Sequence, residues 1–146
     1  MKKLLFILMS FFCISFIEWH YNLDEAQQLA KKDHKYILLN FSGSDWCGPC
    51  IQMHNEIFNA ISFKRFADTT LVLVNADFPR KKKNQLPSKQ QDLNNKMADQ
   101  YNSQGKFPFT VLLDANGKII KYWDGYPNVK PEAFVKQVKS IIDADR

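Results

Sequence analysis

Two cysteines, Cys47 and Cys50, mark the point where a short apolar run gives way to a predicted helix. The run, residues 36–41, is typical of a strand buried on both faces, and the helix is predicted over residues 47–59. The first turn of a helix stabilises a thiolate through its unpaired N–H groups and its dipole. The arrangement therefore predicts a reactive thiolate with an accessible sulfur at Cys47, and a second thiol about one turn deeper at Cys50. Pro49 fits this position because its missing N–H costs nothing in a first helical turn.

This arrangement suits thiol–disulfide exchange. Cys47 would attack a substrate disulfide, and Cys50 would attack the resulting mixed disulfide and release the product. A bare pair of cysteines at this spacing also fits half of a zinc site or an inert structural disulfide. Zinc would need two further ligands, and the nitrogen donors that the chain offers are His20, His34 and His54. The longer string, with Trp46 in front and Gly48-Pro49 inside, favours the redox interpretation.

Residues 1–15 have the three parts of a secretory signal peptide. Lys2 and Lys3 give a positive start, an apolar run follows, and the small side chains of Cys13 and Ser15 precede a cut after Ser15. The apolar run of about 14 residues is shorter than the ~20 that span a bilayer, although an uncleaved membrane anchor stays open as an alternative. We therefore expect residues 1–15 to be an export signal and residues 16–146 to form one domain.

The composition of the chain is that of an ordinary globular domain. Its 146 residues match one domain, and 45% hydrophobic with 24% charged residues excludes a disordered tail or a collagen-like fibre. Removal of residues 1–15 would lower the net charge from +5 to +3, and four of the remaining positive charges lie together at Arg80–Lys83. Because that run lacks interleaved aromatic residues and lies between prolines, we interpret it as a solvated loop or a partner-docking surface rather than a nucleic-acid site. Removal of Cys13 leaves one pair of cysteines, and such pairs tend to be disulfides in an oxidising compartment.

Apolar runs and helical patterns together predict an α/β fold. Helices are expected over residues 23–32, 47–59, 62–67 and 92–101 and from Pro131 onward, and strands over residues 36–41, 71–76, 109–113 and 118–122. Asn22 and Glu25 have the spacing of a capping box, and Asn116-Gly117 indicates a hairpin between the last two strands. A strand, a helix and a strand in that order form a right-handed unit with parallel strands. The predicted architecture is a central mixed β-sheet flanked by helices on both faces.

A second motif, Phe107-Pro108-Phe109-Thr110, follows the cysteine pair some 60 residues later. Together with Trp46-Cys47-Gly48-Pro49-Cys50, it resembles the thioredoxin superfamily over about Trp19 to Asp143, with the strongest likeness to exported bacterial thioredoxin-like proteins. The resemblance implies a thioredoxin-like fold in which Pro108 is cis and faces the cysteine pair. It also implies that the backbone of Phe107 pairs with the extended substrate. The residues that it places at the substrate are Trp46, Gly48, Pro49, Phe107, Pro108 and Gly125.

One position departs from the family. Thioredoxins usually carry a buried Asp in the strand before the motif, proposed to move protons for the inner cysteine, and here Asn40 stands in its place. Asn does not ionise, so proton transfer from Cys50 would need water or another group. For that reason no reduction potential is carried over from the family, in which it ranges from about −270 to −120 mV.

The sequence thus predicts an exported thiol–disulfide oxidoreductase that exchanges its Cys47–Cys50 pair with disulfide-containing or dithiol protein substrates. A Gly-Pro dipeptide in an oxidising compartment favours a reductase, which an electron donor in the membrane would recharge. No cofactor, metal or nucleic acid is implied, and we expect a monomer in the periplasm, with a membrane-anchored form as the alternative. Two other functions stay open: a binding module that uses the cysteines for metal delivery or as a fixed disulfide, and a chaperone that works through the substrate groove.

Overall fold

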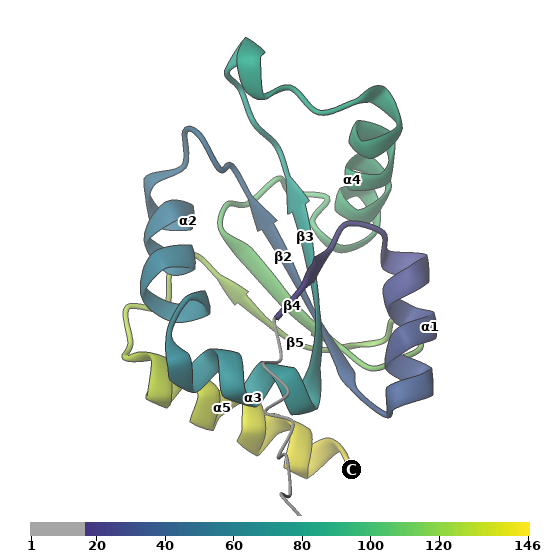
Figure 1. Cartoon of the computed structure of the whole chain (residues 1–146), viewed down its shortest axis with the longest axis vertical. Coiled ribbons are helices and arrows are strands. Elements are labelled where there is room, and N and C mark those ends of the chain that lie inside the picture. The colour runs from purple at the N-terminus through teal and green to yellow at the C-terminus, as the bar shows by residue number, and fades with distance from the viewer. Residues whose placement is uncertain (1–16) are drawn as a thin grey trace, which may run out of the picture.

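The computed structural model describes residues 17–146 and centres on a five-stranded mixed sheet in the order β1-β3-β2-β4-β5 (Figure 1). The strands are β1 (Trp19–His20), β2 (Tyr36–Ser42), β3 (Leu71–Asp77), β4 (Phe109–Leu113) and β5 (Ile119–Asp124). Strands β1 and β2 both run parallel to β3, whereas β4 runs antiparallel to β2 and to β5. The predicted mixed sheet and the predicted hairpin are therefore confirmed.

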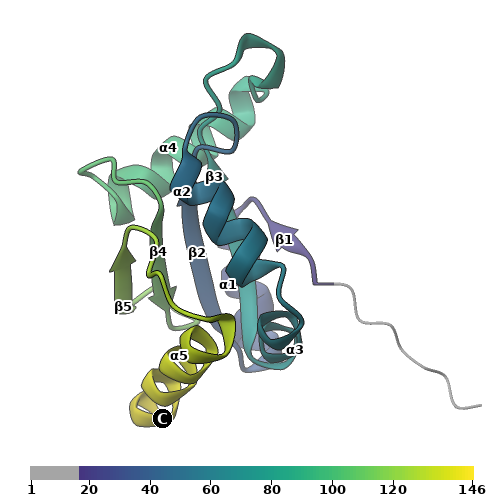
Figure 2. The same cartoon turned by 90° about the vertical axis from the view of Figure 1, so that its left-hand side faces the viewer.

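Helices cover both faces of the sheet, as the sequence predicts (Figures 1 and 2). The helices are α1 (Leu23–Asp33), α2 (Gly48–Met53), η1 (His54–Phe58), α3 (Ile61–Thr70), η2 (Lys82–Asn84), α4 (Ser88–Tyr101) and α5 (Pro131–Asp145). Helices α1 and α4 pack on one face, and α2, η1, α3 and α5 pack on the other.

The central strand β2 is buried on both faces, which explains its unbroken apolar run. Ile37, Leu39 and Phe41 face the core under α1 and α4, whereas Leu38 belongs to the core under α2, α3 and α5. Side chains alternate along a strand, so Asn40 points to the same face as Leu38. The sheet thus brings one buried amide to the face that carries the cysteine helix.

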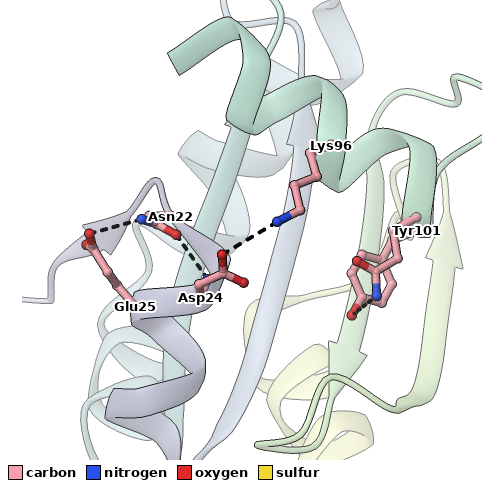
Figure 3. A network of polar contacts seen from close by, with 6 residues as sticks. Asn22, Asp24, Glu25, Lys96 and Tyr101 are labelled. Atoms are coloured by element: carbon pink, nitrogen blue, oxygen red, sulfur yellow. Dashed lines mark hydrogen bonds and ion pairs between the residues drawn. The ribbon is translucent and has the colours of Figure 1, made fainter. Parts of the chain in front are cut away.

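Helix α1 begins where the polar residues at its start predict (Figure 3). The Asn22 side chain accepts a hydrogen bond from the Asp24 N–H at 3.0 Å and donates one to the Glu25 carboxylate at 2.9 Å. Glu25 therefore binds the Asn22 side-chain amide, whereas a full capping box would use the Asn22 backbone N–H. A 3.6 Å ion pair between Lys96 and Asp24 links α4 to α1 on the same face of the sheet.

Several elements differ from the sequence prediction. Helix α3 extends to Thr70 and not only to residue 67, and β5 extends to Asp124 and not only to residue 122. Strand β1 was not expected, because two residues paired with Leu73 and Val74 are too short to leave a pattern. Helix α4 begins at Ser88 and not at residue 92, because its first turn follows Pro87 and carries only polar side chains. The predicted helix over residues 47–59 begins at Gly48, and its last turn is a π-helix in which the Asn59 N–H binds the His54 carbonyl at 2.9 Å.

The predicted export signal at residues 1–15 lies outside the described residues. Within residues 17–146, none of the helices combines the length and the apolar character needed to cross a bilayer.

Candidate active site

Cys47 and Cys50 form a disulfide at the start of α2, just beyond the end of β2. Cys47 is the N-cap residue, its sulfur accepts a 3.3 Å hydrogen bond from the Cys50 N–H, and the two Cα atoms lie 5.2 Å apart. Each cysteine exposes 5% of its surface. In this disulfide form little of either cysteine is exposed, and the accessibility expected of the Cys47 thiolate concerns the dithiol form. Gly48 and Pro49, between them, are exposed.

The indole of Trp46 is fixed from several directions. Its Nε1–H donates a 2.7 Å hydrogen bond to the Phe78 carbonyl, and its ring meets the ring of Phe107 edge-on at a centroid distance of 5.4 Å. Gly43 lies directly against the indole, because a Cβ atom there would come within 2.6 Å of Trp46 Cζ2. The Arg80 guanidinium stacks over the indole ring, with its central carbon 3.6 Å from the ring centroid. Trp46 is therefore a rigid wall beside Cys47.

The second motif approaches the same wall. The Phe107–Pro108 peptide bond is cis, as the resemblance implies, and Phe107 packs against both Trp46 and Phe78. The Gly125 N–H donates a 2.9 Å hydrogen bond to the Pro108 carbonyl. Gly125 has a φ of +86°, a conformation that glycine adopts without strain. The structure thus joins Trp46 to Phe107, and Pro108 to Gly125, in two direct contacts.

A cavity of about 230 Å³ lies on the inner side of Cys50. Its lining residues are Trp19, Tyr21, Asn40, Ser42, Ser44, Cys50, Ile51, His54, Asn55 and Asn75. Most of these side chains are polar but uncharged. The cavity therefore places polar side chains next to Cys50.

Asn40 is held in place from both neighbouring strands. Its Oδ1 accepts a 3.0 Å hydrogen bond from Thr110 of β4, and its Nδ2 donates a 3.2 Å hydrogen bond to Asn75 of β3. The Ser42 hydroxyl lies 3.2 Å from both the Asn75 side-chain oxygen and the Asp77 carboxylate, so these two acceptors share its single proton. The polar chain beside Cys50 thus starts from a neutral amide and reaches its first carboxylate at Asp77.

Sequence reasoning missed the role of Asp45. Its carboxylate accepts 2.9 Å hydrogen bonds from the backbone N–H groups of Arg80 and Lys81 and from the side chain of Asn84. These bonds, the one from Arg80 foremost, lower the pKa of Asp45. The loop of small residues at 42–45 indicates a tight turn. Neither the packing of Gly43 on Trp46, three residues further on, nor the binding of residues 80–84 by Asp45 leaves a recognisable pattern in the sequence.

Within residues 17–146, no three His, Cys, Asp or Glu side chains gather closely enough to hold a metal ion. Of the three histidines considered as nitrogen donors, His54 lines the cavity with Cys50 and packs near Trp19 at a ring distance of 6.5 Å.

Comparison with known proteins identifies the family. A family model described as a thioredoxin-like domain matches residues 23–142. The chain belongs to the thioredoxin-like family. This family assignment agrees with the sheet order, the helix positions, the cis proline and the cysteine pair at the start of α2.

Named relatives within the family point to disulfide chemistry. The chain is 39% identical over 126 residues to the disulfide bond reductase DsbH of Chlamydia pneumoniae, covering 86% of this chain and 73% of that protein. It is 30% identical to the thioredoxin-related protein DsbJ of Chlamydia pneumoniae, covering 88% of this chain but only 36% of that longer protein. A solved structure of a DsbH oxidoreductase superposes with a TM-score of 0.79 at 37% identity, over 88% of this chain and 86% of that one.

The family, these relatives and the Cys47–Cys50 disulfide together make this protein a thiol–disulfide oxidoreductase. That prediction from the sequence is confirmed, as is the thioredoxin-like fold.

Proposed function

We propose that this protein is an exported reductase of protein disulfides, in which Cys47 is the nucleophile and Cys50 resolves the intermediate. The observation that carries the proposal is the position of Cys47 as the N-cap of α2, with Cys50 one turn further on and bonded to it. Support for the direction of the reaction comes from the 39% identical relative that is named a disulfide bond reductase.

The reaction begins from the dithiol form. The Cys47 thiolate attacks one sulfur of the substrate disulfide, the substrate S–S bond breaks, and the second substrate sulfur leaves as a thiolate. Cys50 then loses its proton and attacks the Cys47 sulfur, which releases the first substrate sulfur and forms the Cys47–Cys50 disulfide. Two electrons pass from the enzyme to the substrate, whose two thiolates take up protons. A dithiol donor in the membrane would return the enzyme to its starting form by the reverse exchange.

The residues around the pair have separate parts in this proposal. Trp46 and Phe107 form the wall along which the substrate chain lies, and their edge-on contact keeps the two motifs together. The backbone before Pro108 pairs with the extended substrate, and Gly125 holds the Pro108 carbonyl from behind. Gly48 and Pro49, both exposed, form the surface next to the Cys47 sulfur that attacks the substrate.

A trapping experiment tests the two cysteine roles. In Cys50→Ser the mixed disulfide cannot be resolved, so Cys47 should stay covalently bound to substrate proteins, visible as adducts that disappear on treatment with dithiothreitol. Cys47→Ser is the matched control and should form far fewer adducts. Absence of adducts in Cys50→Ser, or equal trapping by both variants, would contradict the assignment.

Export rests on the predicted signal at residues 1–15. The protein recovered from the envelope of the producing bacterium should begin at Phe16, which the intact mass would show. A full-length chain that stays in the cytoplasm would contradict export, whereas a full-length chain in the membrane would support the anchored form.

A further inference from the structure

The loop between β3 and α4 borders the active site with a cluster of positive charge. We define the basic loop as residues Arg80–Lys83, which lie in the segment that projects beyond the end of β3 in Figure 1. Its first member, Arg80, stacks on Trp46 with 3.6 Å between the guanidinium carbon and the indole centroid. Trp46 directly precedes Cys47, so the basic loop flanks the wall beside the reactive pair.

The basic loop is held by its backbone. The carboxylate of Asp45 accepts the N–H groups of Arg80 and Lys81 and the side-chain amide of Asn84, each at 2.9 Å. Gln85 adds a 3.0 Å hydrogen bond to the Pro79 carbonyl. These bonds use main-chain and side-chain amide groups. The loop is therefore fixed beside the active site without a short ion pair to its guanidinium or ammonium groups.

None of the charges of the basic loop takes part in an ion pair among the described residues, although the Lys81 charge helps to lower the pKa of Asp45. All four side chains are exposed, and the ion pairs found within residues 17–146 join Lys96 to Asp24, Lys106 to Asp124 and Lys139 to Asp143. Two carboxylates lie nearby, Asp45 and Asp77, so positive charge is in excess at this edge of the site. A cluster of one sign raises the local concentration of oppositely charged ligands and their rate of association.

We propose that the basic loop docks an acidic segment of the substrate protein that flanks the disulfide to be reduced. The inference rests on the proposed reductase function and specifies its substrate class. A polypeptide is the partner that the position favours, because the loop adjoins a cysteine pair whose chemistry acts on protein disulfides. The stacked Arg80 and the neighbouring Lys82 and Lys83 would contact the acidic residues while Cys47 attacks the disulfide.

Three synthetic peptides with the same disulfide, flanked by Glu, Gln or Lys residues, test this proposal with the reduced protein. At low ionic strength we expect kcat/KM to be about tenfold higher for the Glu peptide than for the Lys peptide. In 0.5 M salt this ratio should approach one, because the Debye length is then only about 3–5 Å. In K82Q/K83Q the ratio should fall to about threefold, since two of the four charges are gone.

The matched control is K31Q/K32Q. Lys31 and Lys32 are also adjacent and exposed, but they lie in the last turn of α1, before the start of β2 and thus at the opposite end of the sheet. This variant loses the same charge and should keep the full ratio. An equal fall in both variants, or equal rates for all peptides with the unmodified protein, would overturn the docking proposal.

A binding measurement separates docking from catalysis. The same peptides with Ser in place of both cysteines cannot be reduced, and the Glu form should bind the oxidised protein about tenfold more tightly than the Lys form at low salt. Equal binding of the Glu and Lys forms would overturn the docking proposal, whether or not the protein reduces any peptide. Tighter binding of the Glu form without reduction of any of the disulfide peptides would contradict only the reductase function. Stronger binding of a single-stranded DNA 20-mer than of the Glu peptide would also overturn it, in favour of a nucleic-acid site.

Discussion

A methyl group added at Gly43 would collide with the indole that forms one wall of the active site. In Gly43→Ala the new Cβ would lie 2.5 Å from Nε1 and 2.6 Å from Cζ2 of Trp46, closer than non-bonded atoms approach. The indole cannot easily move away. Its Nε1–H is bonded to the Phe78 carbonyl at 2.7 Å, and the ring of Phe107 and the guanidinium of Arg80 pack on it.

The size of the effect follows from these contacts. Overpacking a tightly filled site costs about 1–3 kcal/mol, and loss of the Trp46–Phe78 hydrogen bond adds about 1 kcal/mol. Gly43→Ala should therefore lower the free energy of unfolding by about 2–4 kcal/mol. Gly48→Ala is the matched control, because a Cβ there meets no atom within 4 Å and Gly48 lies in the first turn of α2. That substitution should be neutral or stabilise by up to about 1 kcal/mol.

Urea unfolding of both oxidised variants, followed by circular dichroism, measures the difference. Quenching of tryptophan fluorescence by acrylamide should increase in Gly43→Ala, because the displaced Trp46 ring becomes more accessible. A free energy of unfolding in Gly43→Ala equal to that of Gly48→Ala would refute the reasoning, since it would mean that Trp46 is not packed against Gly43 in solution.

Two further predictions concern single carboxyl groups. Asn40 exposes 6% of its surface, so the carboxyl introduced by Asn40→Asp should have a raised pKa. The substitution should destabilise the protein by about 1–3 kcal/mol at neutral pH. The loss of stability should shrink as the pH falls below that pKa and the carboxyl becomes neutral, which urea unfolding between pH 4 and pH 8 would show. A destabilisation that does not change with pH would contradict this. The bonds from Arg80, Asn84 and Lys81 lower the pKa of Asp45, so its hold on the basic loop is complete above the ordinary pKa of an aspartate and is lost as the pH falls through the lowered value. In an acid titration the chemical shifts of the Arg80 and Lys81 amide protons should change as this hold is lost, and in Asp45→Asn they should not change with pH. Shifts that do not change with pH in the unmodified protein would contradict the hold of Asp45 on the basic loop.

The parts of the structure that the sequence predicts are those whose causes are local or periodic. Strands β2 and β3 are continuous apolar runs because helices cover both faces of the sheet, and Pro131 with an apolar stripe specifies α5. The cysteine pair at the start of α2 combines a motif with a helix start, so its position was also predictable. The turn of π-helix at His54–Phe58 was not, because it changes only the hydrogen-bond partners in a segment that still appears helical.

Two features that the sequence did not predict depend on the three-dimensional path of the chain. Asp45 binds the backbone at residues 80 and 81, and a side chain that pairs with backbone 35 residues away leaves no complementary pattern in the chain. The packing of Gly43 on Trp46 depends on the path of one tight loop. The charge of the basic loop could be recognised from the sequence as a docking surface. Its place beside the active site depends on these contacts and could be seen only in the structure.

The decisive measurement is the reduction potential of the Cys47–Cys50 pair, obtained by equilibrating the protein in glutathione buffers and quantifying the dithiol form. A protein that reduces substrate disulfides needs a stable disulfide of its own, so the reductase function predicts a value nearer to about −270 mV than to about −120 mV. A value near −120 mV, typical of strong oxidants of this fold, would contradict the reductase function and reverse the direction of electron flow.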